Sequence, residues 1–171
     1  MELKTPAFRA CFSQEKNNFV SLVNLATGTE YIRQAPRDPL VELYALADGQ
    51  KKKLVAGQPQ VSGDSEHLEI CYAEFGGLDI RMTVHCHAVQ DRLSIRAELE
   101  NHSQADLVEI LLPHIGGLYL GGEAHPDYII YPHHAGERSK NPVMAYGQNK
   151  KDFWRASSVA FEDIYRREIN Y

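Results

Sequence analysis

The residues with the clearest chemical potential lie in one short segment, YIIYPHHAGE, at residues 128–137. His133 and His134 are adjacent, and Glu137 follows a glycine that permits a tight reversal of the chain. An imidazole beside a carboxylate can hydrogen-bond to sugar hydroxyls, or can act as general acid and base when both pKa values are tuned. The alternative interpretation is a turn whose histidines bond to nearby carbonyl groups. We predict contact with a ligand or a neighbouring domain, with direct catalysis by His133, His134 and Glu137 as the less favoured hypothesis.

Further polar and aromatic residues flank this segment in loops rich in glycine and proline. The run GGEAH at 121–125 lacks the spacing of a phosphate-binding loop, so we interpret it as a tight loop. Trp154, the only tryptophan, could stack on a sugar ring or could belong to a core or an interface. The predicted ligand-contacting or interdomain residues are Glu123, His125, Tyr131, His133, His134, Glu137 and Trp154.

A possible metal site is the motif HCH, in which His85 and His87 would project from the same face of a strand. Such a pair can bind a metal ion if a third ligand comes from elsewhere; otherwise it belongs to a polar outer face. The sequence has no HExxH motif and no cysteine cluster, so we predict no metal ion and no cofactor. Its three cysteines form no CxxC pair and are expected to be buried small hydrophobic residues in a reducing compartment, the cytoplasm.

The elements that position these residues are predicted to be strands, because the dominant hydrophobic period is two. Apolar and polar residues alternate over 79–88 and again over 92–101, with a short turn at Gln90 and Asp91 between them. A third strand at 67–75 precedes them, which predicts an antiparallel three-stranded meander. Other strand candidates lie at 7–13, 18–24, 40–47, 52–57, 106–115 and 128–131. The pattern favours an all-β antiparallel sandwich, with residues 158–168 as either a short helix or an irregular strand.

The composition is that of an ordinary globular chain. Of the 171 residues, 43% are hydrophobic, and 18 basic residues stand against 23 acidic ones, for a net charge of −5. The longest basic run is Lys51 to Lys53, so no broad basic surface for nucleic acid is expected. No stretch approaches the roughly 20 apolar residues that span a bilayer. We therefore predict a single domain over residues 1–171, with neither a nucleic acid nor a membrane as partner.

Two segments, LSIRAELENHSQADLVEILLPHIGGLYLGG and YIIYPHHAGE, resemble the N-terminal β-sandwich of bacterial glycoside hydrolase-like proteins. In that family a galactose mutarotase-like supersandwich precedes a (β/α)8 catalytic barrel. The resemblance covers roughly residues 8–145, with Pro113 and the pair Gly116-Gly117 ending the strand after Glu100-Asn101-His102-Ser103. It implies a carbohydrate-related protein whose catalytic carboxylates lie on the barrel. The strand-embedded histidine and Asn-rich motif of aldose epimerases is not found in this chain.

Three functional hypotheses follow. The leading one is a noncatalytic N-terminal sandwich that shapes or supports the active site of a following barrel, with a carbohydrate and that barrel as partners. The second is a self-contained mutarotase or epimerase that uses His133 or His134 and Glu137 as acid and base. The third is an assembly domain without sugar contact that uses residues 113–156. The final residues, REINY, resemble the start of another strand, so we expect a sandwich that is incomplete at its C-terminal end and part of a longer protein.

Overall fold

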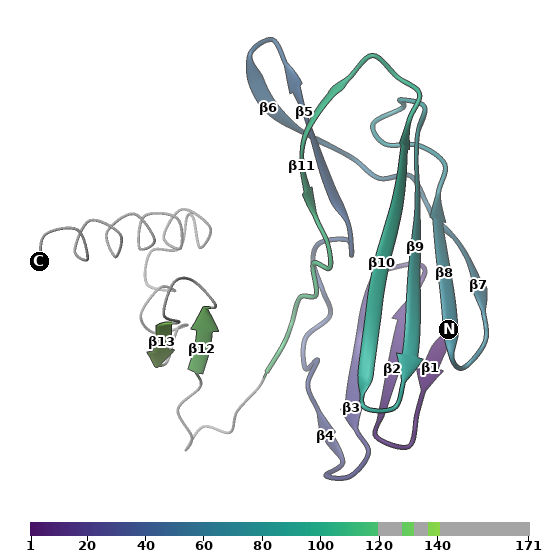
Figure 1. The fold of residues 1–171 in the computed structure, drawn as a ribbon, viewed down its shortest axis with the longest axis vertical. Helices are drawn as coiled ribbons and strands as arrows, with labels where there is room; N and C mark the ends of the chain where they lie inside the picture. Colours follow the sequence, from purple (N-terminus) through teal and green to yellow (C-terminus); the bar gives the residue numbers. More distant parts are fainter. Residues whose placement is uncertain (120–127, 132–136, 141–171) are drawn as a thin grey trace, which may run out of the picture. The chain divides into compact units, whose positions relative to one another are not determined.

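The computed structural model describes residues 1–119, 128–131 and 137–140. The chain forms two compact units, 1–119 and 120–171, and each is considered by itself. Every strand pairing in the described residues is antiparallel, and the predicted all-β sandwich class is confirmed (Figure 1). A single domain over 1–171 stays a prediction. Within the described part of the chain, no helix is long and apolar enough to cross a membrane.

The first unit contains three sheets. The first has the order β1-β2-β3-β4, the second β10-β9-β8-β7, and the third β11-β5-β6. The strands are β1 Glu2–Lys4, β2 Phe8–Ser13, β3 Asn18–Asn24, β4 Thr29–Glu30, β5 Glu42–Ala47, β6 Gln50–Leu54, β7 Gln60–Gly63, β8 His67–Tyr72, β9 Ile80–Val89, β10 Arg92–Asn101 and β11 Asp106–Leu111. Figure 1 shows β9 and β10 along the length of this unit, with β6 near one end and β4 near the other.

The predicted meander is confirmed as β8, β9 and β10. β9 and β10 pair over ten residues each without a register shift, from Arg92 opposite Val89 to Asn101 opposite Ile80. Gln90 has a positive φ of 54° in the two-residue connection, which is the left-handed conformation that tight hairpins use. The alternation in β9 is also as expected, because Ile80, Met82, Val84 and Cys86 are buried.

The core lies between the two four-stranded sheets. One side of it comes from β1, β2 and β3, where Phe12 and Phe19 pack edge to face with ring centres 5.5 Å apart. The other side comes from alternate residues of β8 and β9, among them Ile70 and Tyr72. The Tyr72 hydroxyl donates a hydrogen bond of 2.5 Å to Oδ1 of Asn17, just before β3, which ties the two sheets together. This is the layered arrangement expected of a sandwich.

The third sheet departs from the predicted strand bounds. β11 ends at Leu111 rather than at residue 115, and it contains an irregularity between Leu107 and Glu109. Pro113 has no backbone N–H to donate, which explains why regular pairing stops before it. The segment after β11 lies against the connection that follows β4, where Leu118 forms an antiparallel bridge with Ile32.

The second unit is described only at two strands. β12 Tyr128–Tyr131 pairs with β13 Glu137–Lys140, so the strand predicted at 128–131 is confirmed. Tyr131 lies opposite Glu137 in this hairpin. Glu137 is therefore the first residue of β13. Other predictions concern residues outside the described part of the chain. These are the predicted contact residues Glu123, His125, His133, His134 and Trp154, and the segment 158–168, predicted to be a helix or an irregular strand.

Candidate functional site

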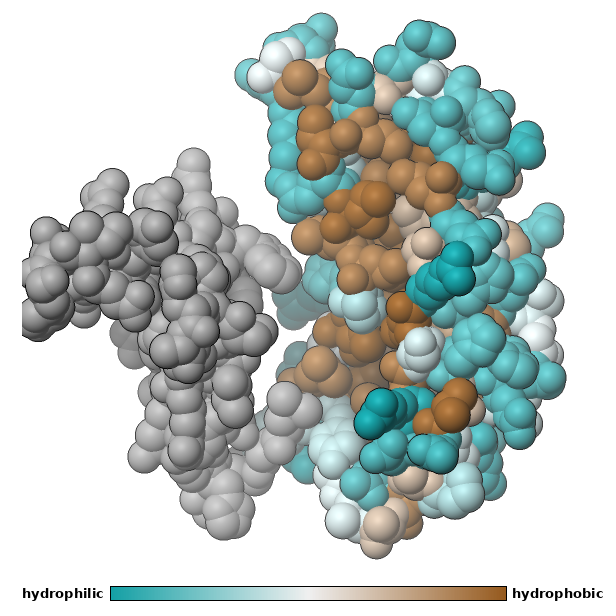
Figure 2. Space-filling model, in the orientation of Figure 1, coloured by the Kyte–Doolittle hydropathy of each residue, from teal (hydrophilic) through white to brown (hydrophobic). Residues whose placement is uncertain are grey.

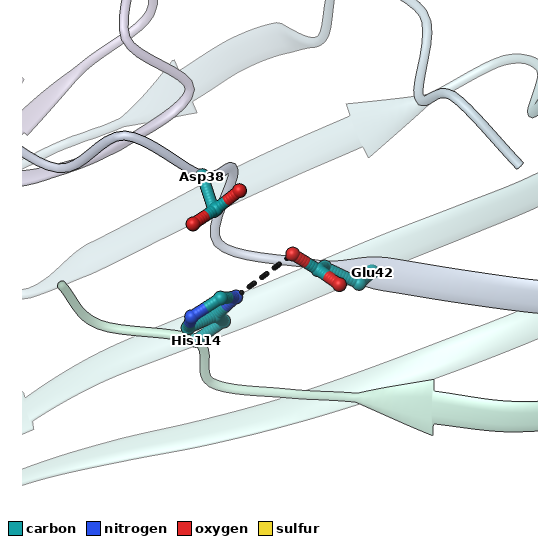
Figure 3. Close-up of side chains that lie close together, drawn as sticks. All are labelled: Asp38, Glu42 and His114. Atoms are coloured by element: carbon teal, nitrogen blue, oxygen red, sulfur yellow. Dashed lines mark hydrogen bonds and ion pairs between the residues drawn. The ribbon is translucent and has the colours of Figure 1, made fainter. Parts of the chain in front are cut away.

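A carboxylate-histidine cluster lies at the start of the third sheet. Glu42 is the first residue of β5, Asp38 precedes it in a loop, and His114 follows Pro113 after β11. One ligand-type atom from each of these three residues lies within 4.8 Å of the others (Figure 3). Only tertiary structure brings them together, because Glu42 and His114 are 72 residues apart in the chain.

A buried amide holds the backbone of this cluster. The side-chain nitrogen of Asn18 donates hydrogen bonds of 2.8 Å to the backbone carbonyl oxygens of both Asp38 and His114. Asn18 has no exposed surface, and its Oδ1 accepts a hydrogen bond from the backbone N–H of Phe19. The backbone N–H of His114 also donates to the carbonyl oxygen of Leu40 at 2.8 Å. Because each polar group of Asn18 has a partner, the amide fixes the spacing of Asp38 and His114 without an unsatisfied buried group.

Glu42 is the centre of the cluster and only 5% of its surface is exposed. Its Oε1 accepts a hydrogen bond from the ammonium group of Lys53 at 2.7 Å, and the same oxygen lies 3.1 Å from Nδ1 of His114. Its Oε2 accepts a hydrogen bond of 2.5 Å from the hydroxyl of Tyr44. Lys53 also lies 3.9 Å from Oδ1 of Asp38. We call these five residues the Glu42 network: Asp38, Glu42, Tyr44, Lys53 and His114.

The protonation of the network follows from these contacts. Burial by itself raises the pKa of Glu42, but the hydrogen bonds from Lys53 and Tyr44 and the charges of Lys53 and His114 outweigh it and lower the pKa below its ordinary value. Glu42 is thus a carboxylate at neutral pH. The hydrogen bond to that carboxylate, followed by burial, raises the pKa of Tyr44 to about 12, so Tyr44 remains a neutral donor.

The tautomer of His114 is set in the same way. An ionised carboxylate only accepts hydrogen bonds, so Nδ1 of His114 must carry the proton that faces Glu42. A neutral His114 then leaves Nε2 as an acceptor, which is the form that serves a general base or a metal ligand. Asp38, Glu42 and His114 could each supply one metal ligand. Lys53, however, already supplies a positive charge beside Glu42, so this carboxylate has an ionic partner among the protein's own groups.

The predicted pair His85 and His87 lies on β9, and both side chains are on the same face, as expected. His87 packs edge to face on His67, with ring centres 4.4 Å apart. His85 places Nδ1 3.6 Å from a carboxylate oxygen of Glu69. Among the described residues, the close group of three metal-ligating side chains is Asp38, Glu42 and His114, and neither histidine of the pair belongs to it.

Two hollows lie elsewhere on the first unit. One, of about 520 Å³, is shallow, and its lining comprises His85, His87, Val89, Ser94, Arg96 and Glu98. The other, of about 420 Å³, is mostly apolar and includes Phe8, Leu22, Tyr31, Leu93, Ile95, Pro113 and Ile115. Figure 2 shows apolar side chains gathered in a band along the face that carries β10 and β11. The Glu42 network lines neither of these hollows.

The Glu42 network was not predicted from the sequence. Its one local signal is the run LVELYALA, where Glu42 and Tyr44 occupy alternate positions and so share one face of a strand. Lys53 faces Tyr44 across the hairpin that turns at Asp48-Gly49. Nothing in the local pattern pairs that face with His114, because this contact depends on which distant segments become neighbours.

No protein-family model matches the chain, and no match is found among the curated proteins or the solved structures. The fold and the described site define an all-β antiparallel sandwich with a buried and fully partnered carboxylate network. The galactose mutarotase-like family stays an expectation from the sequence.

Proposed function

We propose that the chain is a noncatalytic β-sandwich module of a carbohydrate-active protein and that it supports a separate catalytic domain. The observation that carries the noncatalytic part is the environment of Glu42. Both of its oxygens are committed to Lys53, His114 and Tyr44, and its pKa is lowered. A general acid needs a carboxyl group whose pKa is raised and which faces substrate, and glycoside hydrolysis commonly needs two such groups. Glu42 is built instead to join β5, β6 and the segment after β11.

The carbohydrate part of the proposal rests on the resemblance of residues 93–122 and 128–137 to glycoside hydrolase-like sandwiches. A (β/α)8 barrel of the same protein is the proposed catalytic partner. Within the described residues, exposed apolar side chains favour a packing role as well, namely Leu46, Val55, Val108, Ile110 and Leu118. An assembly domain without sugar contact is accordingly the second candidate.

Free cysteines support the proposed cytoplasmic location. Cys11, Cys71 and Cys86 form no disulfide, and burial raises the pKa of Cys86 to about 12. A buried thiol of that kind is unreactive and suits a reducing compartment. Of the three, Cys86 is fully buried as predicted, whereas Cys11 and Cys71 are half-buried.

The catalytic question is tested by following anomer interconversion of free galactose and glucose by NMR in the presence of the 171-residue chain. The noncatalytic proposal expects the buffer rate, for the wild type and for Glu42→Gln alike. If the chain raises the interconversion rate above that of buffer and His134→Ala abolishes the increase, the mutarotase hypothesis is established. If Glu42→Gln abolishes the increase instead, the Glu42 network is catalytic.

The sugar question needs a separate measurement on the full-length protein that contains the chain. We expect His134→Ala to weaken the affinity for a carbohydrate ligand, measured by calorimetry, without changing the thermal unfolding of the sandwich. Glu42→Gln is the matched control, because it should lower stability and leave affinity unchanged. Unchanged affinity in both variants, together with normal assembly on the catalytic domain, would favour the assembly candidate.

A further inference from the structure

The edges of the sheets differ in how well they are protected against pairing with another chain. An exposed edge strand offers unpaired N–H and C=O groups, and proteins protect such edges with short strands, lysines or bulges. Among the described strands of the first unit, β1, β4 and β7 are short edges of two to four residues. β6 is an edge with three consecutive lysines, and β11 is an edge with a register irregularity.

β10 is an edge without any of these protections. It has ten residues, all paired with β9 in one unbroken register, and within the described residues it pairs on that side only. Its sequence, RLSIRAELEN, contains no proline, glycine or lysine. A long and regular edge of this kind can serve as the template for addition of another strand.

We propose that β10 is a homodimer interface, in which it pairs antiparallel with β10 of a second copy of this chain. The sheet β10-β9-β8-β7 of one copy would then join the same sheet of the other copy, and the two would form one continuous sheet across a two-fold axis. A two-fold axis makes the contact self-complementary. If one residue of the first copy lies opposite a second residue of the other copy, the same pair also meets with the copies exchanged.

The charges and the length of β10 favour one register. In an antiparallel pair, directly opposed residues lie on the same side of the sheet. The apolar sides of the two strands therefore match only when the two-fold axis passes through a residue of β10. Centring the axis on Ala97 places Arg96 of each copy opposite Glu98 of the other. Centring it on Arg96 or on Glu98 would instead oppose two identical charges at the axis, which is unfavourable. Centring it on Ile95 avoids like charges, but it opposes only residues 92–98 of the two strands, whereas the axis at Ala97 opposes residues 93–101. Both side chains are available, with 76% of the Arg96 side chain and 58% of the Glu98 side chain exposed.

The apolar face of β10 fits the same register. Leu93, Ile95, Ala97 and Leu99 are half-buried and point toward the core side. With the axis at Ala97, Ile95 of each copy lies opposite Leu99 of the other, so apolar residues meet apolar residues. The apolar band along β10 in Figure 2 would continue from one copy into the next. Cross-strand pairs of both kinds stabilise antiparallel sheets.

Sedimentation velocity of the 171-residue chain over a range of concentrations tests the proposal. The wild type should sediment as a monomer and dimer in equilibrium. Arg96→Glu should weaken the dimer about tenfold or more, because it opposes two pairs of like charges, and Glu98→Arg should do the same. The double variant Arg96→Glu/Glu98→Arg restores opposite charges in the pairs and should restore the dimer. It also keeps the contact within the strand between Arg96 and Glu98, seen at 3.0 Å, with the charges exchanged.

Far-UV circular dichroism of each variant confirms that the fold is retained. A wild type that stays monomeric at all concentrations overturns the proposal, as does a dimer whose strength is indifferent to both single substitutions. Amide hydrogen exchange adds a second readout. Protection of β10 amides should rise with protein concentration, and protection that is already complete in the monomer would assign the edge to another part of the same polypeptide.

Discussion

At the scale of a single residue, Glu42 shows how a buried charge can be stabilised. Its carboxylate has three donors from β5, β6 and the segment after β11, namely Tyr44, Lys53 and His114. A buried charge is tolerated when it is paired and hydrogen-bonded, and removal of one member leaves the others without a partner. The residue-level predictions therefore concern Glu42.

We expect Glu42→Gln to lower the free energy of unfolding by about 1–3 kcal/mol, because it removes a negative charge that holds three donor groups. Urea unfolding at neutral pH measures this change. The matched control is Glu109→Gln, which breaks the exposed ion pair with Lys51 and should cost less than about 0.5 kcal/mol. Equal losses in the two variants would mean that the burial of Glu42 adds nothing.

The lowered pKa of Glu42 predicts a specific pH dependence. A carboxyl group whose pKa is lower in the folded state adds stability above its ordinary value of 4.5 and loses that contribution as the pH falls through the folded-state pKa. The difference in unfolding free energy between wild type and Glu42→Gln should consequently be constant from pH 7 to about 4.5 and shrink below it. Glu30 also has a lowered pKa, but it is present in both proteins and cancels in the comparison. A gap that widens on acidification would contradict the assigned sign.

At the scale of elements, the segment after β11 depends on a close approach of two backbones. Gly117 has a φ of 73°, and its carbonyl oxygen accepts a hydrogen bond of 3.1 Å from the backbone N–H of Arg33. A Cβ atom at Gly117 would lie 2.1 Å from the carbonyl oxygen of Gln34, which is backbone and cannot rotate away. The glycine thus lets residues 112–119 lie against the connection that follows β4.

Gly117→Ala is therefore expected to lower the free energy of unfolding by about 2–4 kcal/mol, through both the left-handed conformation and the contact with Gln34. Gly28→Ala is the control, since Gly28 has a φ of 71° but no neighbouring atom within 4 Å. It should cost only about 1 kcal/mol, the conformational part alone. Thermal and urea unfolding of the two variants separate the steric part from the conformational part, and similar losses would show that the close approach is relaxed in solution.

At the scale of the molecule, the hydrophobic core belongs to the first unit. The buried core residues run from Leu3 on β1 to Ala88 on β9, with partly buried residues of β10 and β11 packed against them. A unit that contains its own core can fold as a domain.

We expect a fragment of residues 1–119 to fold by itself. Its far-UV circular dichroism should be that of a β-protein, and urea should unfold it in one cooperative transition. Amides of β8 and β9, the two interior strands of their sheet, should show the slowest hydrogen exchange. A fragment without a cooperative transition would mean that residues beyond 119 are required for stability.

The sequence by itself determined the class of fold and the local elements. The period of two in β9 and β10 and the two-residue connection at Gln90 and Asp91 predicted their pairing, because alternation and turn residues are properties of neighbouring positions. The strand at Tyr128–Tyr131 was predictable for the same reason, whereas the place of Glu137 was not, since the hairpin register had to be known.

Only the tertiary structure decided the candidate site. Alternation tells which face of a strand is buried, but it does not tell which distant strand or loop will cover that face. Asn18 reaches His114 across 96 residues of sequence, and Glu42 reaches His114 across 72. The same limit explains the unprotected edge of β10, because a strand becomes an edge only through the order of its sheet. Contacts of this kind arise from the packing of whole sheets, and no local pattern of residues encodes them.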